Sequence, residues 1–204
     1  MRKLAIVSIL LLALALVSST VSCAQHEIAP NVLDWTGDET AHTAYGPIKG
    51  FEDEAGTWVW KAIPYAKPPA GDLRWKAPQD PDPWNVTRKE TEFCSECTQY
   101  NIFNSVVGDE DCLYLNIWRP QSEESNLPVF FWIHGGGNSL GTASDEGYNG
   151  ARIASKSNMV VVTVNYRLGP MGWFAHESLR TGEPGDETDD SGNYGTLDLI
   201  KALE

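Results

Sequence analysis

Hydrophobic and polar residues alternate in the first part of the chain and give way to nearly continuous apolar runs in the second. From "GPIKGFED" through "TWVWKAIPYA" the alternation predicts a short antiparallel hairpin region. The segment "CLYLNIW" (112–118) also alternates and stops at Pro120, which is typical of an edge strand. In contrast, "PVFFWIH" (128–134) and "MVVVTVNY" (159–166) are almost entirely apolar, as parallel strands buried on both faces are.

The segments between these strands indicate helices and loops. "DEGYNGARIASKSN" has room for a crossover helix between the two apolar runs, which would complete a βαβ unit. "SGNYGTLDLIKALE" predicts a helix with Leu197, Ile200 and Leu203 on one face. "KPPAGDLRWKAPQDPDPWN" contains too much proline for a helix or a central strand, so we expect a loop there. A sheet with only two buried strands would leave a hydrophobic edge unpaired, which predicts further strands after residue 204.

The first 24 residues combine two basic residues with a short apolar run and small residues, which indicates a secretory signal peptide. Two alternative cleavage sites fit this segment. "TVSC" resembles a bacterial lipoprotein motif and would place a lipid anchor on Cys23, whereas "SCA" supports a cut after Ala24. We therefore expect an exported protein that is periplasmic, extracellular or anchored to a membrane as a lipoprotein. Residues 25–45 are predicted to be irregular, and the folded domain is predicted over 46–204.

Charge and cysteine content limit the classes of partner. The formal net charge is −13, and removal of residues 1–24 takes away Arg2 and Lys3 but no acid, so it becomes −15. An acidic chain repels polyphosphate, and we expect no nucleic-acid partner. The acidic residues are spread through loops such as "GDETDD" (185–190), which fits a solvated surface.

Four cysteines in an exported chain favour disulfides. If Cys23 is set aside, Cys94, Cys97 and Cys112 remain, and one of them has no partner. Cys94 and Cys97 form a C-x-x-C pattern, but no second pair and no paired histidines follow at the spacing of metal ligands. We therefore predict no metal site and no cofactor.

The stretch "WIHGGGNSLG" (132–141) contains two overlapping catalytic signatures. G-N-S-L-G matches a G-x-S-x-G nucleophile elbow centred on Ser139, and H-G-G-G matches a loop that supplies amides to an oxyanion hole. An elbow serine follows its strand directly and leads into a helix, whereas here three glycines intervene and Gly141 and turn-forming residues postpone a helix to about Tyr148. Consecutive glycines also allow close approach of the backbone to a ligand. The pattern favours the oxyanion loop over a nucleophile at Ser139, with a plain structural turn as the other alternative.

Five segments together resemble the type-B carboxylesterases, a family that includes the cholinesterases and the non-catalytic neuroligins. They are "IPYAKPPAGDLRWKAPQ", "EDCLYLNIWRP", "PVFFWIHGGG", "VVVTVNYRLGPMGWF" and "SGNYGTLDLIKAL". They stand in the family's order and cover most of the chain after residue 45. The resemblance implies an α/β-hydrolase fold, with a mostly parallel sheet, helices on both faces and an N-terminal antiparallel hairpin region. Residues 46–204 would be the N-terminal part of that domain, which is incomplete at the C-terminus.

The same resemblance implies hydrolysis of a small-molecule carboxylic ester by serine acyl transfer. It assigns oxyanion donation to the backbone N–H groups of Gly136 and Gly137, with Gly135 shaping the loop. His134 ends the strand before these glycines, and this position favours support of the loop over a catalytic role. The Ser, Glu or Asp, and His of the triad would lie beyond residue 204, so we expect the chain alone to be inactive. The alternatives are a non-catalytic neuroligin-like binding protein or an inactive truncated product on the same scaffold.

Other positions implied by the resemblance are structural. Cys97 and Cys112 match the first disulfide of the family, and pairing of Cys94 with Cys112 is the alternative. Two buried ion pairs are also implied, Arg74 with Glu110 and Arg167 with Asp198, against the alternative of ordinary surface charge. The short segment between Cys97 and Cys112 has no Trp to stack on a quaternary ammonium group, so choline esters are not expected as substrates. Acyl and alcohol specificity and the oligomeric state are left open by the sequence.

Overall fold

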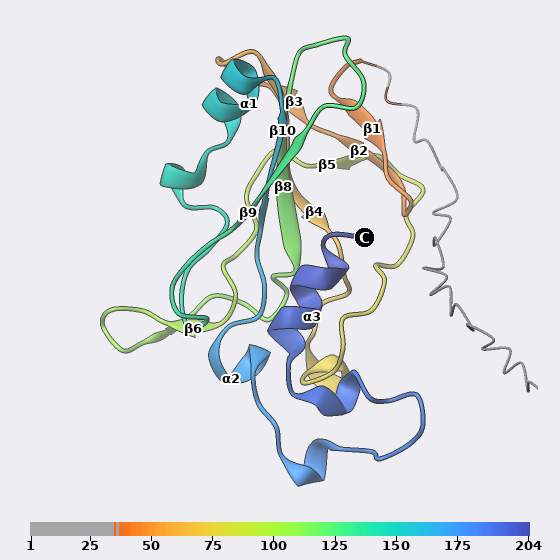
Figure 1. The fold of residues 1–204 in the computed structure, drawn as a ribbon, viewed down its shortest axis with the longest axis vertical. Coiled ribbons are helices and arrows are strands. Elements are labelled where there is room, and N and C mark those ends of the chain that lie inside the picture. Colours follow the sequence, from red (N-terminus) through yellow and green to blue (C-terminus); the bar gives the residue numbers. More distant parts are fainter. Residues whose placement is uncertain (1–34, 36) are drawn as a thin grey trace, which may run out of the picture. The chain divides into compact units, whose positions relative to one another are not determined.

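A five-stranded mixed sheet is the centre of the computed structural model, which describes residue 35 and residues 37–204 (Figure 1). In spatial order its strands are β3 (Phe51–Glu52), β4 (Thr57–Pro64), β8 (Tyr114–Pro120), β10 (Val160–Val164) and β9 (Val129–Ile133). The predicted antiparallel hairpin is present as β3 and β4, and the two apolar runs pair in parallel as β9 and β10. In this part of the chain the other neighbours are antiparallel, so the mostly parallel character expected of the sheet is not seen here. The predicted signal peptide and Cys23 lie outside the described residues.

The prediction of an edge strand at 112–118 is wrong, because β8 lies in the middle of the sheet. It pairs antiparallel with β4 on one side and with β10 on the other. Its alternating pattern reflects the difference between its two faces, since Trp118 is buried and Ile117 only partly so. Pro120 is tolerated because it stands beyond the last β8–β10 pair, Trp118 with Val161, where the strand needs no donor on that side.

Helices cover both faces of the sheet, as the resemblance implies. The helix α1 (Ala151–Ser157) joins β9 to β10, completes the predicted βαβ unit and packs Ala154 into a cluster with Val161. The helix α3 (Tyr194–Lys201) contributes to the cluster that contains Val164. Val161 and Val164 are three positions apart along β10, so their side chains point to opposite faces.

The buried face of α3 is not the one predicted from its apolar residues. Tyr194 and Asp198 are almost fully buried, whereas Ile200 and Leu203 are 52% and 65% exposed. The periodicity of apolar residues misses this face because one of its members is a carboxylate, which is buried through its pairing with Arg167. A buried charge needs such a partner, and the partner lies far away in the sequence.

The outer edge of β9 is unpaired in the part of the chain that the structure describes. Val129, Phe130 and Ile133 are 63%, 40% and 44% exposed, so the expectation that this strand is buried on both faces is not met here. The neighbouring strand β10 is buried from its second residue onward. The prediction of further strands after residue 204 would account for the exposed apolar edge, and it stays a prediction.

Short strands and turns complete the fold. A three-stranded sheet contains β1 (Thr40–His42), β2 (Pro47–Lys49) and β5 (Arg88–Lys89), and a two-stranded one contains β6 (Gln99–Tyr100) and β7 (Val106–Val107). Residues 25–45 are thus not irregular throughout, because β1 lies within them. The remaining helical turns are α2 (Gly169–Gly172) and 3-10 turns at Gly71–Leu73, Glu146–Tyr148, Glu177–Leu179 and Asp189–Ser191. In the described part of the chain, no helix has the length and apolar character needed to cross a membrane.

Candidate functional site

The HGGG loop, residues 134–141, begins where β9 ends. His134 is 3% exposed, and its carbonyl oxygen accepts a hydrogen bond from Tyr166 Oη at 2.9 Å. The imidazole of His134 also stacks on the Tyr166 ring, with 4.6 Å between the ring centroids. Since Tyr166 follows β10, the parallel pairing of β9 and β10 determines where the loop starts.

The His134 imidazole is neutral and turned into the protein. Its Nδ1 lies 2.9 Å from the carbonyl oxygen of Gly135, so Nδ1 carries the proton and donates. Burial lowers the pKa of His134, and the bond to Gly135 only partly opposes that effect. The Nε2 atom is buried and has no hydrogen-bond partner among the described residues. This geometry ties the ring to its own loop rather than to a nucleophile.

Gly136 occupies a conformation and a space that only glycine fits. Its φ is +119°, and a Cβ added there would lie 1.8 Å from the carbonyl oxygen of Leu140. Its own carbonyl accepts from the amides of Ser139 at 3.1 Å and Leu140 at 3.3 Å, so the loop folds back on itself. A Cβ added at Gly135 or Gly137 would meet no atom within 4 Å. The turn therefore requires glycine at position 136, while its neighbours face open space.

The amides of Gly136 and Gly137 are available to a ligand. Both residues are exposed, and neither N–H donates to an acceptor in the ranges that the structure describes. Adjacent backbone donors on a fixed turn are a suitable arrangement for binding an oxygen that becomes negatively charged.

Ser139 does not have the surroundings of a nucleophile. Its side chain is exposed, and the hydroxyl donates to the carbonyl oxygen of Gly137 at 3.2 Å instead of to a histidine. The next helical residues are the 3-10 turn at Glu146–Tyr148, and α1 starts only at Ala151. This is the delayed helix that the sequence predicts, and it differs from a strand–turn–helix elbow.

A mainly apolar hollow of about 400 Å³ lies beside the HGGG loop. The loop contributes Ser139 and Leu140 to its lining, while Tyr100 and Val106 come from β6 and β7 and Met171 from α2. Its mainly apolar lining suits an apolar group of a ligand.

The far end of the HGGG loop is held by residues that the sequence reasoning did not single out. Gln99 pairs with both backbone groups of Gly141, and the Gly169 amide donates to the Asn138 carbonyl at 2.6 Å. The only available signal for Gln99 is its position two residues after Cys97. Neither contact has a local sequence pattern, because each joins segments that lie far apart in the chain.

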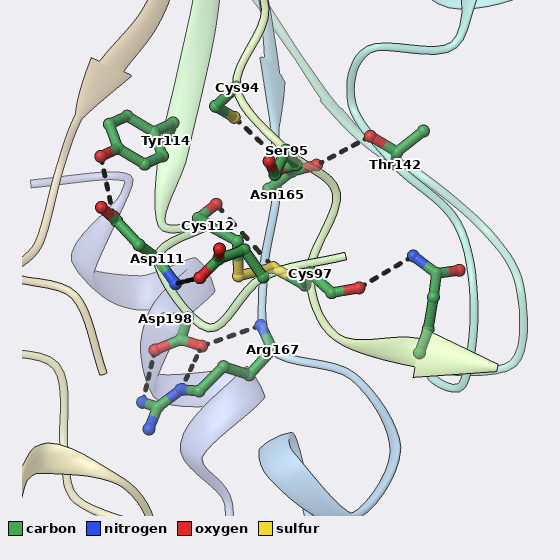
Figure 2. Close-up of a disulfide and its surroundings, with 12 residues drawn as sticks. Cys94, Ser95, Cys97, Asp111, Cys112, Tyr114, Thr142, Asn165, Arg167 and Asp198 are labelled. Atoms are coloured by element: carbon green, nitrogen blue, oxygen red, sulfur yellow. Dashed lines mark hydrogen bonds and ion pairs between the residues drawn. A yellow bond between two sulfur atoms is a disulfide. The ribbon is translucent and has the colours of Figure 1, made fainter. Parts of the chain in front are cut away.

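Cys97 and Cys112 form a disulfide, with an S–S distance of 2.07 Å and a Cα–Cα distance of 5.0 Å (Figure 2). This is the pairing that the resemblance implies, and it leaves Cys94 with a free thiol. Asn165 Nδ2 lies 3.4 Å from the Cys94 sulfur. Burial raises the pKa of the Cys94 thiol to about 12, so it stays protonated at neutral pH. A half-buried, protonated thiol is a poor nucleophile.

Removal of the disulfide by the double change Cys97→Ala/Cys112→Ala should lower the free energy of unfolding by about 3 kcal/mol. The reason is that the bridge closes a chain segment with a sequence separation of 15, which restricts the unfolded state. Urea denaturation followed by circular dichroism measures the loss. Cys94→Ala is the matched control and should cost clearly less, because it leaves the bridge intact. An equal loss in both variants would contradict this account.

Of the two implied ion pairs, only Arg167–Asp198 is fully buried. Its side chains are 3% and 0% exposed, and the guanidinium donates to both carboxylate oxygens, at 2.8 and 2.6 Å (Figure 2). The Arg167 amide adds a third bond at 3.0 Å. Burial raises the pKa of Asp198, and the bonds from Arg167 oppose that rise. The pair joins the segment that follows β10 to α3.

The Arg74–Glu110 pair is present but not buried as implied. Arg74 Nε donates to Glu110 at 2.6 Å, while the two side chains are 39% and 24% exposed. Its exposure is intermediate between the two alternatives from the sequence, a buried pair and ordinary surface charge. Solvent screening makes its contribution to stability smaller than that of the buried pair.

Comparison with known proteins decides the family. The model described as "Carboxylesterase family" matches residues 37–204 of this chain. The chain belongs to the carboxylesterase family. The para-nitrobenzyl esterase of Bacillus subtilis is 40% identical over 168 residues, which cover 79% of this chain and 33% of that protein. Carboxylesterase 1C of Mus musculus is 37% identical over 194 residues, covering 87% and 32%.

Solved structures agree with the assignment to the carboxylesterase family. A structure titled PNB esterase superposes with a TM-score of 0.71 at 41% identity, over 81% of this chain and 33% of that one. A carboxylesterase from Geobacillus stearothermophilus gives a TM-score of 0.68 at 40% identity, over 81% and 33%. The α/β-hydrolase fold implied by the sequence is thereby confirmed. The chain spans about a third of the length of the relatives it matches.

Proposed function

We propose that this chain is the N-terminal part of an exported carboxylic-ester hydrolase that acts by serine acyl transfer. In this proposal the chain supplies the oxyanion donors, the amides of Gly136 and Gly137, while the Ser, the acid and the His of the triad come from residues after 204. The observation that carries the proposal is the pair of unpaired, exposed amides, within the described residues, on a turn that requires glycine at 136.

The chemistry follows from where charge develops. As the serine oxygen attacks the ester carbonyl, its proton passes to the His of the triad and the electrons of the C=O bond move onto the carbonyl oxygen. Collapse of this intermediate breaks the bond to the alcohol oxygen, which leaves with the proton from that His. Two amides aimed at the carbonyl oxygen bind it more tightly in the transition state than in the ground state, and each donor contributes about 3 kcal/mol. Water then hydrolyses the acyl-enzyme by the same route.

Such donors act strongly only where water is excluded, because solvent competes for the same N–H groups. In the described part of the chain the glycines are exposed. We therefore propose that the remainder of a longer protein covers the HGGG loop. Two observations support this. The chain spans about a third of its relatives, and the apolar edge of β9 has no neighbour among the described strands.

The substrate is proposed only as a class, a small-molecule carboxylic ester. Relatives of similar identity are named for different substrates, including a para-nitrobenzyl esterase and a fumonisin B1 esterase of Sphingopyxis macrogoltabida that is 41% identical over 168 residues. Identity at this level does not choose among them. The apolar hollow beside the loop supports an ester with at least one apolar group.

The proposal is tested with p-nitrophenyl acetate. The 204-residue chain should release nitrophenolate no faster than buffer, because it holds donors but no nucleophile. Sustained hydrolysis that Gly136→Pro abolishes would contradict the proposal. The longer protein, read from the gene past codon 204, should hydrolyse the ester, and Ser139→Ala in it should keep most of that activity. If the downstream sequence lacked both an elbow serine and a later histidine, a non-catalytic binding protein would replace the proposal.

Export is part of the proposal and rests on residues 1–24 of the sequence. N-terminal sequencing of the protein recovered after secretion measures the cut directly. A blocked terminus at a lipid-modified Cys23 would assign the lipoprotein route, and a free Gln25 would assign cleavage after Ala24. Recovery of the protein with residues 1–24 intact and inside the cell would reject export.

A further inference from the structure

Gln99 makes the same pair of bonds to Gly141 that a neighbouring strand would make. Its Oε1 accepts from the Gly141 amide at 2.8 Å, and its Nε2 donates to the Gly141 carbonyl at 2.9 Å. The side chain is 9% exposed, so these bonds form away from bulk water. A primary amide suits this position because it offers one acceptor and two donors within one rigid group.

The position of the Gln99 side chain is itself held by the disulfide segment. The second N–H of its amide donates to the Cys97 carbonyl oxygen at 3.0 Å. Cys97 and Cys112 are 2% and 1% exposed and are joined covalently. On the other side, the backbone of Gln99 pairs with Val107 in the β6–β7 ribbon. The glutamine therefore stands on a rigid part of the molecule.

Gly141, which Gln99 holds in place, packs closely against the start of the HGGG loop. A Cβ added at Gly141 would lie 2.4 Å from His134 Nδ1 and 2.7 Å from the Gly135 carbonyl oxygen, so these groups are in close contact. The Gly135 carbonyl is the acceptor of the His134 ring, and Gly136 follows it. A shift of Gly141 would thus move the groups that precede the two free amides.

We propose that Gln99 is a positioning residue for the oxyanion donors, and that it couples the Cys97–Cys112 disulfide to the HGGG loop. The catalytic role of Gln99 rests on the proposed function, whereas its structural role, holding Gly141 in place, does not. Two other hydrogen bonds hold residues on either side of Gly141. The Gly169 amide holds Asn138, and Asn165 Oδ1 accepts from the Ala143 amide at 2.7 Å. Loss of Gln99 should therefore act locally at Gly141 and leave these ties in place.

The test is amide hydrogen exchange of the 204-residue chain at low concentration, followed by mass spectrometry that resolves single residues. Gln99→Leu keeps the size of the side chain but leaves both backbone groups of Gly141 unpaired. We expect the Gly141 amide to exchange about tenfold faster or more, with smaller increases at Ser139 and Leu140. The amides of β10 should keep their protection. Gln121→Leu, at an exposed glutamine after β8, is the matched control and should change none of these rates.

A second variant separates a specific bond from general loosening. In Gln99→Glu, the ionised carboxylate has no donor for the Gly141 and Cys97 carbonyls, whereas the protonated carboxyl restores one donor and one acceptor toward Gly141. Protection of the Gly141 amide in this variant should be low at about pH 8, because the Gly141 and Cys97 carbonyl oxygens repel the ionised carboxylate and turn it away from that amide. It should recover at about pH 5, since burial favours the neutral acid. Gln99→Leu should show no such recovery.

The outcomes decide the proposal without reference to ester hydrolysis. Unchanged exchange at Gly141 in a folded Gln99→Leu variant, or equal protection of Gln99→Glu at both pH values, would overturn it. In the longer hydrolase, Gln99→Leu should lower kcat about tenfold with little change in KM, because misplaced donors weaken binding of the transition state alone. If that protein hydrolysed no ester, the proposed function would fail, and the exchange result would still decide whether Gln99 positions the loop.

Discussion

Asp198→Ala should lower the free energy of unfolding by about 3–5 kcal/mol, because it leaves the Arg167 guanidinium buried without a counter-charge. The two side chains are 3% and 0% exposed, so water cannot replace the lost carboxylate without opening the structure. The change also removes the acceptor of the Arg167 amide. Urea denaturation followed by circular dichroism, compared with the unchanged chain, measures the difference.

Two further variants make this result specific. Glu110→Ala removes the partner of the half-exposed Arg74 and should cost much less, because its guanidinium remains in contact with solvent. The double change Arg167→Met/Asp198→Leu should recover part of the loss, since it removes both buried charges and keeps apolar volume. A loss from Glu110→Ala as large as that from Asp198→Ala would show that burial does not govern the cost of breaking these pairs.

If the proposed longer ester hydrolase exists, Gly136→Ala should lower its kcat/KM by about 100- to 1000-fold, the effect of losing one oxyanion donor. The added Cβ would stand 1.8 Å from the Leu140 carbonyl, so the turn must open and the amides must move. Gly135→Ala is the matched change, because the same methyl group meets no protein atom within 4 Å and the loop keeps its shape.

Initial-rate kinetics with p-nitrophenyl acetate, on variants that retain the circular dichroism spectrum of the unchanged protein, measure this contrast. Gly135→Ala should lose far less than Gly136→Ala. Equal losses would mean that the glycines are needed for approach of the substrate and not for the shape of the turn. Full activity in Gly136→Ala would reject the HGGG loop as the oxyanion site.

The local pattern of apolar and polar residues was enough to predict several strands and the helix between two of them. The apolar runs became the parallel strands β9 and β10 with α1 between them, and the alternating segment became the β3–β4 hairpin. The glycines and turn residues after β9 predicted that no helix follows Ser139 directly. The family resemblance implied the Cys97–Cys112 bridge, which spacing alone left open.

What the sequence missed depends on contacts between distant segments. Alternation in β8 cannot distinguish an edge strand from a central strand whose faces differ, because the neighbours of a strand are not encoded in it. The face of α3 was misjudged because Asp198 is buried only through Arg167. Gln99 gave no local signal beyond its place two residues after Cys97, since its partner Gly141 lies 42 residues further along the chain.

The bare margin of β9 also bears on how this polypeptide behaves in isolation. A row of strand donors and acceptors without partners in residues 37–204, flanked by the exposed side chains of Val129, Phe130 and Ile133, is a template on which another extended chain can assemble. Two copies could meet there edge to edge, and so could any flexible apolar peptide. Handling the isolated chain at high concentration therefore invites aggregation, and a charged or proline substitution along this margin is the natural remedy.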